Sequence, residues 1–198
     1  MTTNLSKTIG WRGCLALLLA LLPTGCLSPG PGDSSGESLS RSDRARMDSS
    51  ATSALKALYK GNPAARELGG KAKAVLVFPD MVKGGFMIGG QIGNGVLRQN
   101  GRTIGYYNLT AASYGFQAGL QSFGYALFLM NDSALDYLNK SAGWEVGVGP
   151  SLVIVDDGMA KTMTSTTLRD DVYAFVFGQT GLMAGAGLQG SKITRIDQ

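Results

Sequence analysis

The chain of 198 residues contains no histidine. This absence excludes Ser-His-Asp and Cys-His catalysis, and it removes the commonest metal ligand in proteins. Cysteine is scarce as well, since only Cys14 and Cys26 are present. The chain beyond Cys26 therefore has neither a free thiol nor an internal disulfide, which suits an oxidising compartment. We expect a protein without a resident metal or cofactor.

Strong charge of either sign is also missing. The formal net charge is +4, and it falls to +2 once Lys7 and Arg12 near the N-terminus are set aside. This surplus is too small to predict binding of nucleic acid. The distribution is more informative, because six basic residues lie between positions 56 and 83, against the two acids Glu67 and Asp80. The six are Lys56, Lys60, Arg66, Lys71, Lys73 and Lys83.

One nine-residue apolar run, CLALLLALL, spans Cys14–Leu22. A membrane-spanning helix needs about 20 apolar residues, so this run is too short to be one. Because Lys7 and Arg12 precede it, the run is typical of the central region of a secretory signal peptide. We predict a signal peptide over residues 1–25.

The residues PTGC, Pro23–Cys26, follow the apolar run and resemble a bacterial lipobox. In that motif the cysteine is acylated and becomes the mature N-terminus. We predict lipidation at Cys26; the alternative is an ordinary secreted protein cut nearby. Leu27 stands where a protein retained in the inner membrane would carry aspartate. We therefore expect a lipid anchor in the outer membrane, facing the periplasm, with exposure at the cell surface left open.

The remaining chain divides into a tether and one domain. Residues 26–41 are rich in Pro, Gly and Ser and predict a flexible tether. Residues 42–198 are long enough for a single domain with its own core. The order of its periodic segments predicts an α+β fold, with N-terminal helices and one helix in the middle. We expect a mainly antiparallel, glycine-rich β-sheet that curls into a barrel or a sandwich.

The expected elements follow from caps, breakers and periodicity. Helices are expected over residues 42–61, capped by Ser42 or Asp43, over 63–68, stopped by Gly69-Gly70, and over 131–142, capped by Asn131 or Asp132. Strands are expected over residues 74–79, 86–92, 96–97, 104–107, 113–130, 144–155, 159–164, 173–177, 182–188 and 193–196. We expect Pro79 to end the first strand, Asn100-Gly101 to form a type I′ turn, and a bulge near Gly124.

Glycine is abundant, at 29 residues, about double the usual share of roughly 7%. GAGLQG, Gly185–Gly190, matches the dinucleotide-binding motif, but only eight residues follow it, too few for such a site. Glycines instead recur at even spacing in the strand patterns, as Gly93 and Gly95, Gly115 and Gly119, Gly147 and Gly149, and Gly185 and Gly187. We interpret this stripe as a device for close packing and curvature, and leave open a groove for a lipid chain.

Three glycine-rich segments carry a family resemblance: FPDMVKGGFMIGGQIGNGVL from Phe78, SYGFQAGLQS from Ser113 and GLMAGAGLQGSKI from Gly181. In order and spacing they are similar to the SYLF domain, which occurs in bacterial lipoproteins and in eukaryotic proteins of cortical actin patches. The resemblance covers Ser50 to Asp197 and implies binding of membrane lipids, notably anionic phospholipids and phosphoinositides. Actin binding by some eukaryotic members is not carried over, because the lipobox-like segment points to a bacterial envelope.

The resemblance also bears on single residues. Lys83 matches a recurrent lysine of the family, whereas Gln189 stands where the family often has Glu. In eukaryotic members lipid binding is attributed to a basic amphipathic segment at the start of the domain, which corresponds to Ser53–Lys73. The candidate lipid-binding residues are therefore Lys56, Lys60, Arg66, Lys71, Lys73 and Lys83. The alternative is that they form an ordinary solvated surface.

The predicted function is that of a non-enzymatic, membrane-anchored periplasmic lipoprotein that binds phospholipids. A structural envelope lipoprotein that binds other proteins is the alternative, so a protein partner stays open. An enzyme would have to use the acid pairs Asp156-Asp157 and Asp170-Asp171. A turn before Gly158 accounts better for the first pair, and a polar loop for the second, so we name no catalytic residue.

Overall fold

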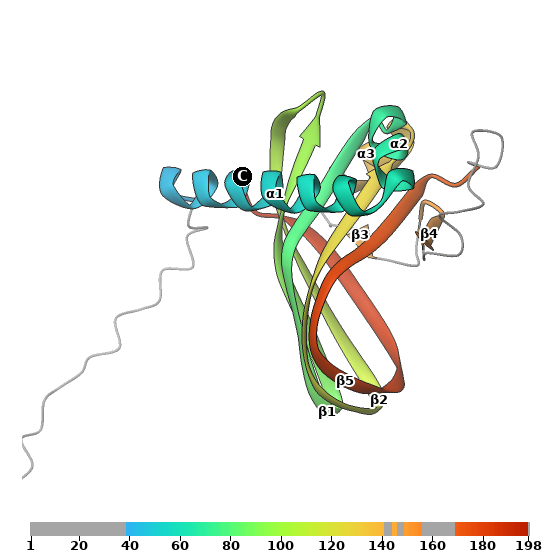
Figure 1. Cartoon of the computed structure of the whole chain (residues 1–198). Helices are drawn as coiled ribbons and strands as arrows, with labels where there is room; N and C mark the ends of the chain where they lie inside the picture. The colour runs from blue at the N-terminus through green and yellow to red at the C-terminus, as the bar shows by residue number, and fades with distance from the viewer. Residues whose placement is uncertain (1–38, 141–143, 146–148, 156–168, 198) are drawn as a thin grey trace, which may run out of the picture. The chain divides into compact units, whose positions relative to one another are not determined.

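The computed structural model describes residues 39–140, 144–145, 149–155 and 169–197, apart from the side chains of 116–117 and 184–189. Residues Gly36–Gln198 form one compact unit. The helices of the described part are α1 (Arg41–Gly61), α2 (Pro63–Lys71) and α3 (Asp132–Leu138). The strands there are β1 (Ala74–Gln99), β2 (Arg102–Leu129), β3 (Trp144–Glu145), β4 (Leu152–Val155) and β5 (Val172–Arg195) (Figure 1). The predicted α+β fold, with helices first and one helix in the middle, is confirmed.

Local capping determines where the helices begin and end. The α1 cap is Ser40, whose hydroxyl accepts the Asp43 N–H at 3.1 Å, and not Ser42 or Asp43 as predicted. Asn62 ends α1, and its side-chain oxygen accepts the Ala65 N–H at 3.0 Å, which caps α2. Asn131, one of the two predicted caps, caps α3 in the same way, and the helix ends at Leu138, earlier than predicted. These short polar side chains therefore define the start of α1, the junction of α1 with α2 and the start of α3.

The Gly69-Gly70 pair does not stop α2, which continues to Lys71. The reason is tertiary: a Cβ at Gly69 would collide with the phenol ring of Tyr59 on α1. Tyr59 in turn lies against Phe128 of β2, with ring centroids 6.3 Å apart. The absence of a side chain at Gly69 therefore allows α2 to pack closely against α1.

Most of the short strands expected from the sequence merge into three long ones. Pro79 does not end the first strand, because a register shift between Phe78 and Met81 accommodates it as a bulge. The turn at Asn100-Gly101, with φ of 51° and 77°, joins β1 to β2 as predicted. The predicted bulge near Gly124 is present in the pairing of β2 with β5.

The segment expected as one strand over residues 144–155 is divided into β3 and β4, with a bend at Pro150 between them. The expected strand over 159–164 lies outside the described residues. The sheet order is β1-β2-β5-β3, all antiparallel, and β4 pairs with β5 in parallel. The sheet is thus mainly antiparallel, as predicted.

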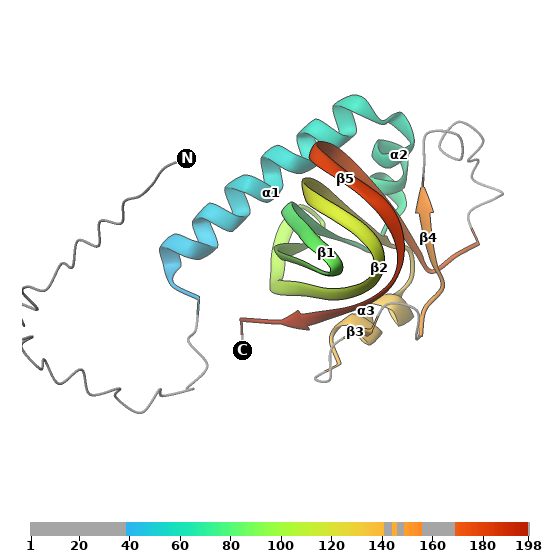
Figure 2. The same cartoon turned by 90° about the horizontal axis from the view of Figure 1, so that it is seen from below.

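Close contact within β1 curls this sheet into a half-barrel. The strand turns at Met87, a non-glycine residue with φ of 60°, and its two arms then lie against each other. A Cβ at Gly93 would collide with Met81, and a Cβ at Gly95 would lie 2.6 Å from the Phe78 ring. The long strands β2 and β5 follow the same bend around β1 (Figure 2). The glycines therefore serve packing and curvature, as interpreted from the sequence.

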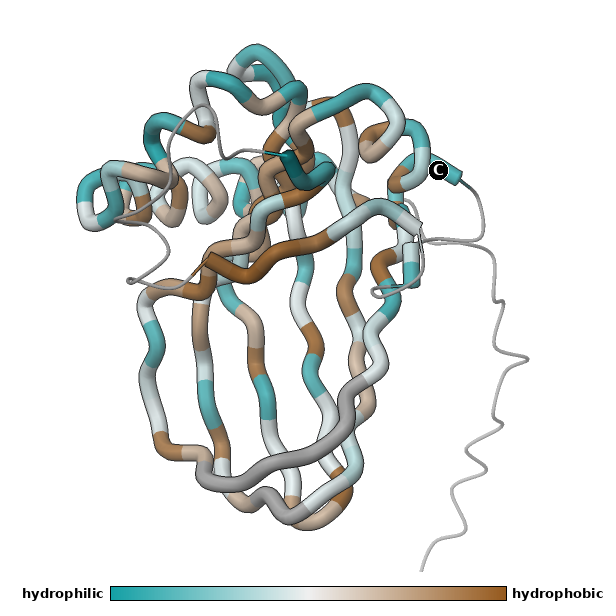
Figure 3. Tube along the Cα trace, turned by 90° about the vertical axis from the view of Figure 1, so that its right-hand side faces the viewer, coloured by the Kyte–Doolittle hydropathy of each residue, from teal (hydrophilic) through white to brown (hydrophobic). Residues whose placement is uncertain are grey.

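Each face of the curled sheet buries its own apolar core. Side chains alternate between the two faces along every long strand, which is visible as alternating hydropathy in Figure 3. Leu76, Leu127 and Trp144 belong to the core on the concave side, which α3 also joins. Val77 and Phe128 belong to the core beneath α1 and α2. The helices α1 and α2 are consequently fixed to the convex side of the sheet.

Asp171 joins three elements at the start of β5. Its carboxylate accepts hydrogen bonds from Asn131 Nδ2 at 2.6 Å, from the Ser151 N–H at 2.9 Å and from Ser151 Oγ at 3.0 Å. These bonds, with that from Asn131 contributing most, hold the pKa of Asp171 below its ordinary value. Since Asn131 caps α3 and Ser151 precedes β4, the carboxylate connects both elements to β5.

We expect Gly119→Ala to destabilise the domain. Gly119 has φ of 140°, and a Cβ there would collide with the Leu182 carbonyl oxygen and lie 2.8 Å from the Met183 Cα. Overpacking of this kind costs about 1–3 kcal/mol, so the melting temperature should fall by several degrees. Gly190→Ala is the matched control, because Gly190 lies in open space on β5. Equal melting temperatures for both variants would contradict the structural role of Gly119.

Asp171→Asn should lower the free energy of unfolding at neutral pH. Because the native pKa of Asp171 is depressed, its stabilisation is present above the ordinary value of about 3.9 and is lost as the pH falls through the lower native value. The free energy of unfolding, measured in urea, should therefore be lower for the variant than for the parent at neutral pH, and the two values should converge in acid. Asp136→Asn, an exposed position on α3, is the control. A difference that is independent of pH would disprove the charge-based role.

Candidate functional site

Five of the six candidate basic residues lie on α1, on α2 or directly before β1, and all five are exposed. Lys56 and Lys60 are exposed on α1, Arg66 and Lys71 on α2, and Lys73 directly before β1. Lys56 and Lys60 are one helical turn apart and share a face. We call these five residues the basic surface.

Asp48 fixes the helix that carries much of this surface. Its two carboxylate oxygens accept hydrogen bonds from the hydroxyls of Thr103, at 2.7 Å, and Tyr106, at 3.0 Å. Its backbone carbonyl accepts a bond of 2.8 Å from Arg98 Nη2, which also donates to Thr52 Oγ1. Both strands of the β1–β2 hairpin thereby bind α1. Burial, followed by the bond to Asp48, raises the pKa of Tyr106, so this hydroxyl remains a donor.

The basic residues differ in how firmly other groups hold them. Arg66 Nη2 donates to the Tyr59 carbonyl at 2.7 Å and so closes the last turn of α1. Lys71 pairs with Glu67 at 2.6 Å, and Lys73 with Asp132 at 3.3 Å. All four side chains of these pairs are more than a third exposed, and exposed ion pairs contribute little to stability. The pairs can therefore exchange for an external anion at small cost.

Lys56 and Lys60 make no ion pair or hydrogen bond with any other described residue. Their ammonium groups are directed to solvent by the amphipathic arrangement of α1, whose Ala51, Leu55 and Leu58 are buried. These two cations can therefore bind an anionic group without first breaking an ion pair within the described part of the protein.

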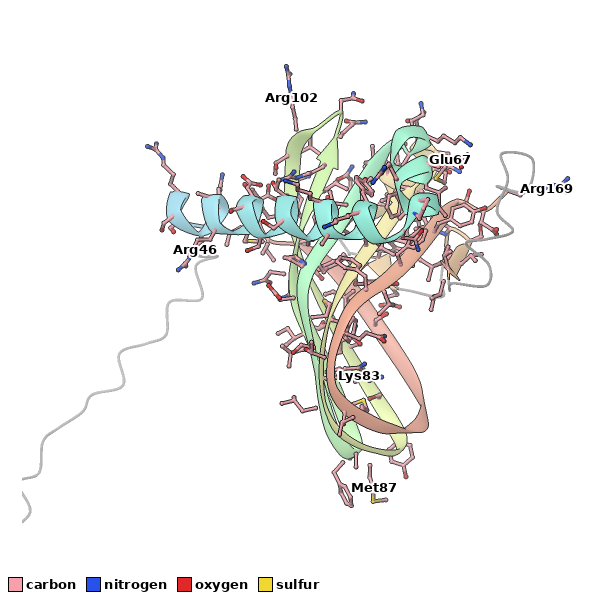
Figure 4. The ribbon with its side chains drawn as sticks, in the orientation of Figure 1. Arg46, Glu67, Lys83, Met87, Arg102 and Arg169 are labelled. Atoms are coloured by element: carbon pink, nitrogen blue, oxygen red, sulfur yellow. The ribbon has the colours of Figure 1, made fainter. Side chains whose placement is uncertain are left out.

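Sequence reasoning missed Arg41 and Arg46, which are exposed on the first turns of the same helix. The available signal was their helical spacing with the later lysines. Arg46 pairs with Asp43, and the pKa of Asp43 is lowered mainly by the Ser40 hydroxyl and then by Arg46. Figure 4 shows Arg46 on α1 and Glu67 on α2 at the helical end of the domain.

Lys83 does not join the basic surface. It lies on β1, opposite Gln121 of β2, and lines a cavity of about 360 Å³ together with Gln91, Tyr125 and Gln179. Burial raises the pKa of Tyr125 to about 12, so its hydroxyl is neutral there. Figure 4 shows Lys83 on the sheet, apart from the helices. Its match to the family lysine therefore concerns the concave side of the sheet.

The acid pair Asp170-Asp171, considered for catalysis, holds the fold together at the start of β5. Asp171 is occupied by Asn131 and Ser151, and the Asp170 carboxylate faces the hydroxyl of Tyr173 at 3.4 Å. Asp156-Asp157 lies outside the described residues, as does Cys26. Within the described part, no group of three His, Cys, Asp or Glu side chains could hold a metal ion. No helix in the described ranges has the length and apolar character to cross a membrane.

Comparison with known proteins assigns a family to the C-terminal part of the chain. Residues 110–198 match the family Ysc84, whose description is Las17-binding protein actin regulator. The match begins within β2, later than the start at Ser50 that the resemblance predicted. Among curated proteins, none matches the chain. Domains of this family are linked to lipid binding and are generally non-catalytic. The C-terminal part of this chain, residues 110–198, thus matches the Ysc84 (SYLF) domain family.

Proposed function

We propose that this chain is a non-enzymatic, phospholipid-binding lipoprotein of the cell envelope. The observation that carries the proposal is the basic surface, in which Lys56 and Lys60 have no described partner, on a chain with a domain linked to lipid binding. Each basic residue near an anionic membrane contributes about 1 kcal/mol. Lys56 and Lys60 on one face of α1, with three more basic residues on α2 and directly before β1, are enough for measurable attachment to anionic headgroups.

The proposed anchor is lipid on Cys26, with the residues that precede Ser40, the cap of α1, as the tether. This anchor would keep the basic surface close to the membrane. The proposed location is the outer membrane on its periplasmic side, since Leu27 and not aspartate follows the cysteine.

Residues 36–198 should bind vesicles of phosphatidylcholine and phosphatidylglycerol more tightly than vesicles of phosphatidylcholine alone. This fragment contains every residue of both cores. Binding, measured by sedimentation, should weaken as the Debye length falls from about 10 Å at 0.1 M salt to about 3 Å at 1 M.

The double variant Lys56→Gln/Lys60→Gln should weaken that binding without changing the melting temperature, because both side chains are exposed and unpaired. Lys140→Gln/Lys192→Gln removes the same charge elsewhere and is the matched control. Equal weakening by both doubles would mean that only net charge matters. No effect of the first double would remove the basic surface from the proposal.

Cys26→Ser in the full chain should abolish acylation, and the protein should then remain unprocessed. Metabolic labelling with a fatty acid and the apparent mass on a denaturing gel measure the two effects. A protein that still carries label, or that is still cut to the mature length, would contradict the anchor. The lipid-binding role of residues 36–198 would be unaffected by that result.

A further inference from the structure

Six apolar side chains are exposed together where the three long strands bend. Their exposed fractions are 76% for Phe86, 49% for Met87 and 70% for Ile88 on β1, 68% for Tyr114 and 64% for Leu120 on β2, and 88% for Leu182 on β5. We call this group the apolar tip. Isolated apolar residues are normal on a protein surface, but a contiguous group indicates an interaction site.

The strand register accounts for the grouping. Gly84, Leu120 and Leu182 are directly opposite one another across β1, β2 and β5. Side chains in such a row lie on the same face and within contact distance, so Leu120 and Leu182 are neighbours. Ile88 is opposite Tyr114 in the same way. Figure 4 shows Met87 at the end of the sheet that is remote from Arg46 and Glu67 on the helices.

Charge is absent from the parts of the three strands that form the tip. No Asp, Glu, Lys or Arg occurs over residues 84–97, 104–131 or 172–191. Entry of this end into an apolar medium therefore carries no cost for removing an ion from water. Docking to a protein normally relies on a polar rim and on complementary charges to select the partner. The tip offers only apolar area, which a fluid hydrocarbon phase accepts without matched geometry.

Backbone pairing limits how deeply the tip can enter a bilayer, because N–H and C=O groups in hydrocarbon must be paired within the protein. The pairing of β2 with β5 runs without a register shift from Tyr107 to Ser122, through the bend. The pairing of β1 with β2 is interrupted between Phe86 and Ile88, and among the described residues the outer edges of β1 and β5 have no strand partner at the bend, so insertion is limited to the side chains of the tip. Tyr114, with an apolar ring and a polar hydroxyl, suits the boundary between headgroups and acyl chains.

We infer that the apolar tip inserts into the acyl-chain region of a phospholipid bilayer, as a contact that does not depend on headgroup charge. The inference rests on the proposed function, which names phospholipid as the partner. It concerns the end of the sheet opposite to the basic surface. This contact predicts a component of vesicle binding that resists salt.

The first test compares two triple variants of residues 36–198. Phe86→Gln/Ile88→Gln/Leu182→Gln alters the tip, and Ile92→Gln/Ile104→Gln/Ile154→Gln alters three apolar residues of 36–59% exposure elsewhere. Binding to phosphatidylcholine vesicles is measured at about 1 M salt, where charge is screened. The tip triple should bind at least about tenfold more weakly, and the control triple should bind like the parent. Melting temperatures confirm that both remain folded.

Equal binding of the tip triple and its parent would overturn the inference. A parent that binds in low salt and loses all binding in high salt would overturn it too, while leaving the proposed function intact. A parent that binds no vesicle under either condition would overturn both.

The second test reports insertion directly and does not depend on affinity. Residues 36–198 contain no cysteine, so Met87→Cys and Arg102→Cys each provide one site for an environment-sensitive fluorophore. Figure 4 shows these two residues at opposite ends of the sheet. Vesicles should shift the emission of the label at 87 to shorter wavelength and leave the label at 102 unchanged. A shift that follows protein concentration without vesicles would identify a second copy as the occupant and overturn the inference.

Discussion

The close approach of the two arms of β1 is the constraint on which the rest of the structure depends. Gly93 lies against Met81 and Gly95 against Phe78, so any larger side chain would hold the arms apart. Because β2 pairs with β1 along its length, and β5 with β2, both must follow the same bend. The concave core around Leu76 and Trp144, and the convex face that receives the helices, both result from this curvature.

The bend also gives the domain two chemically different ends. At one end, helices with Lys56 and Lys60 present unpaired cations, and Asp48 holds α1 in place. At the other end, strand segments without charge expose Phe86 and Leu182. A cationic surface is attracted to headgroups over a Debye length, whereas an apolar tip gains free energy only on contact with hydrocarbon. The two ends therefore respond to different properties of a lipid surface.

The residues that match the family model are only the C-terminal part of the folded domain. The match covers residues 110–198, which contain most of β2 and all of α3, β3, β4 and β5. The sheet cannot curl without β1, because the contacts at Gly93 and Gly95 lie within that strand. The part that precedes the match thus completes the fold and carries the basic surface.

Local signals in the sequence were sufficient for the elements that depend only on neighbouring residues. The Asn100-Gly101 turn, the Asn131 cap and the start of α2 at Pro63 could be predicted because each depends on backbone geometry within a few residues. Glycines at even spacing also indicated close packing, since few other roles suit that residue in a strand.

Long-range pairing decided the remainder. The first strand continues past Pro79 because its pairing with β2 accommodates a bulge there. The position of Gly69 inside α2 is explained by Tyr59, which belongs to another helix. Lys83 was grouped with the helical lysines by sequence proximity, but the pleat directs it to the concave cavity. The apolar tip was missed because Phe86 and Leu182 have the composition of core residues in the sequence. Only the register of three strands, set by contacts such as that between Leu120 and Leu182, which are far apart in the sequence, brings them together at the surface.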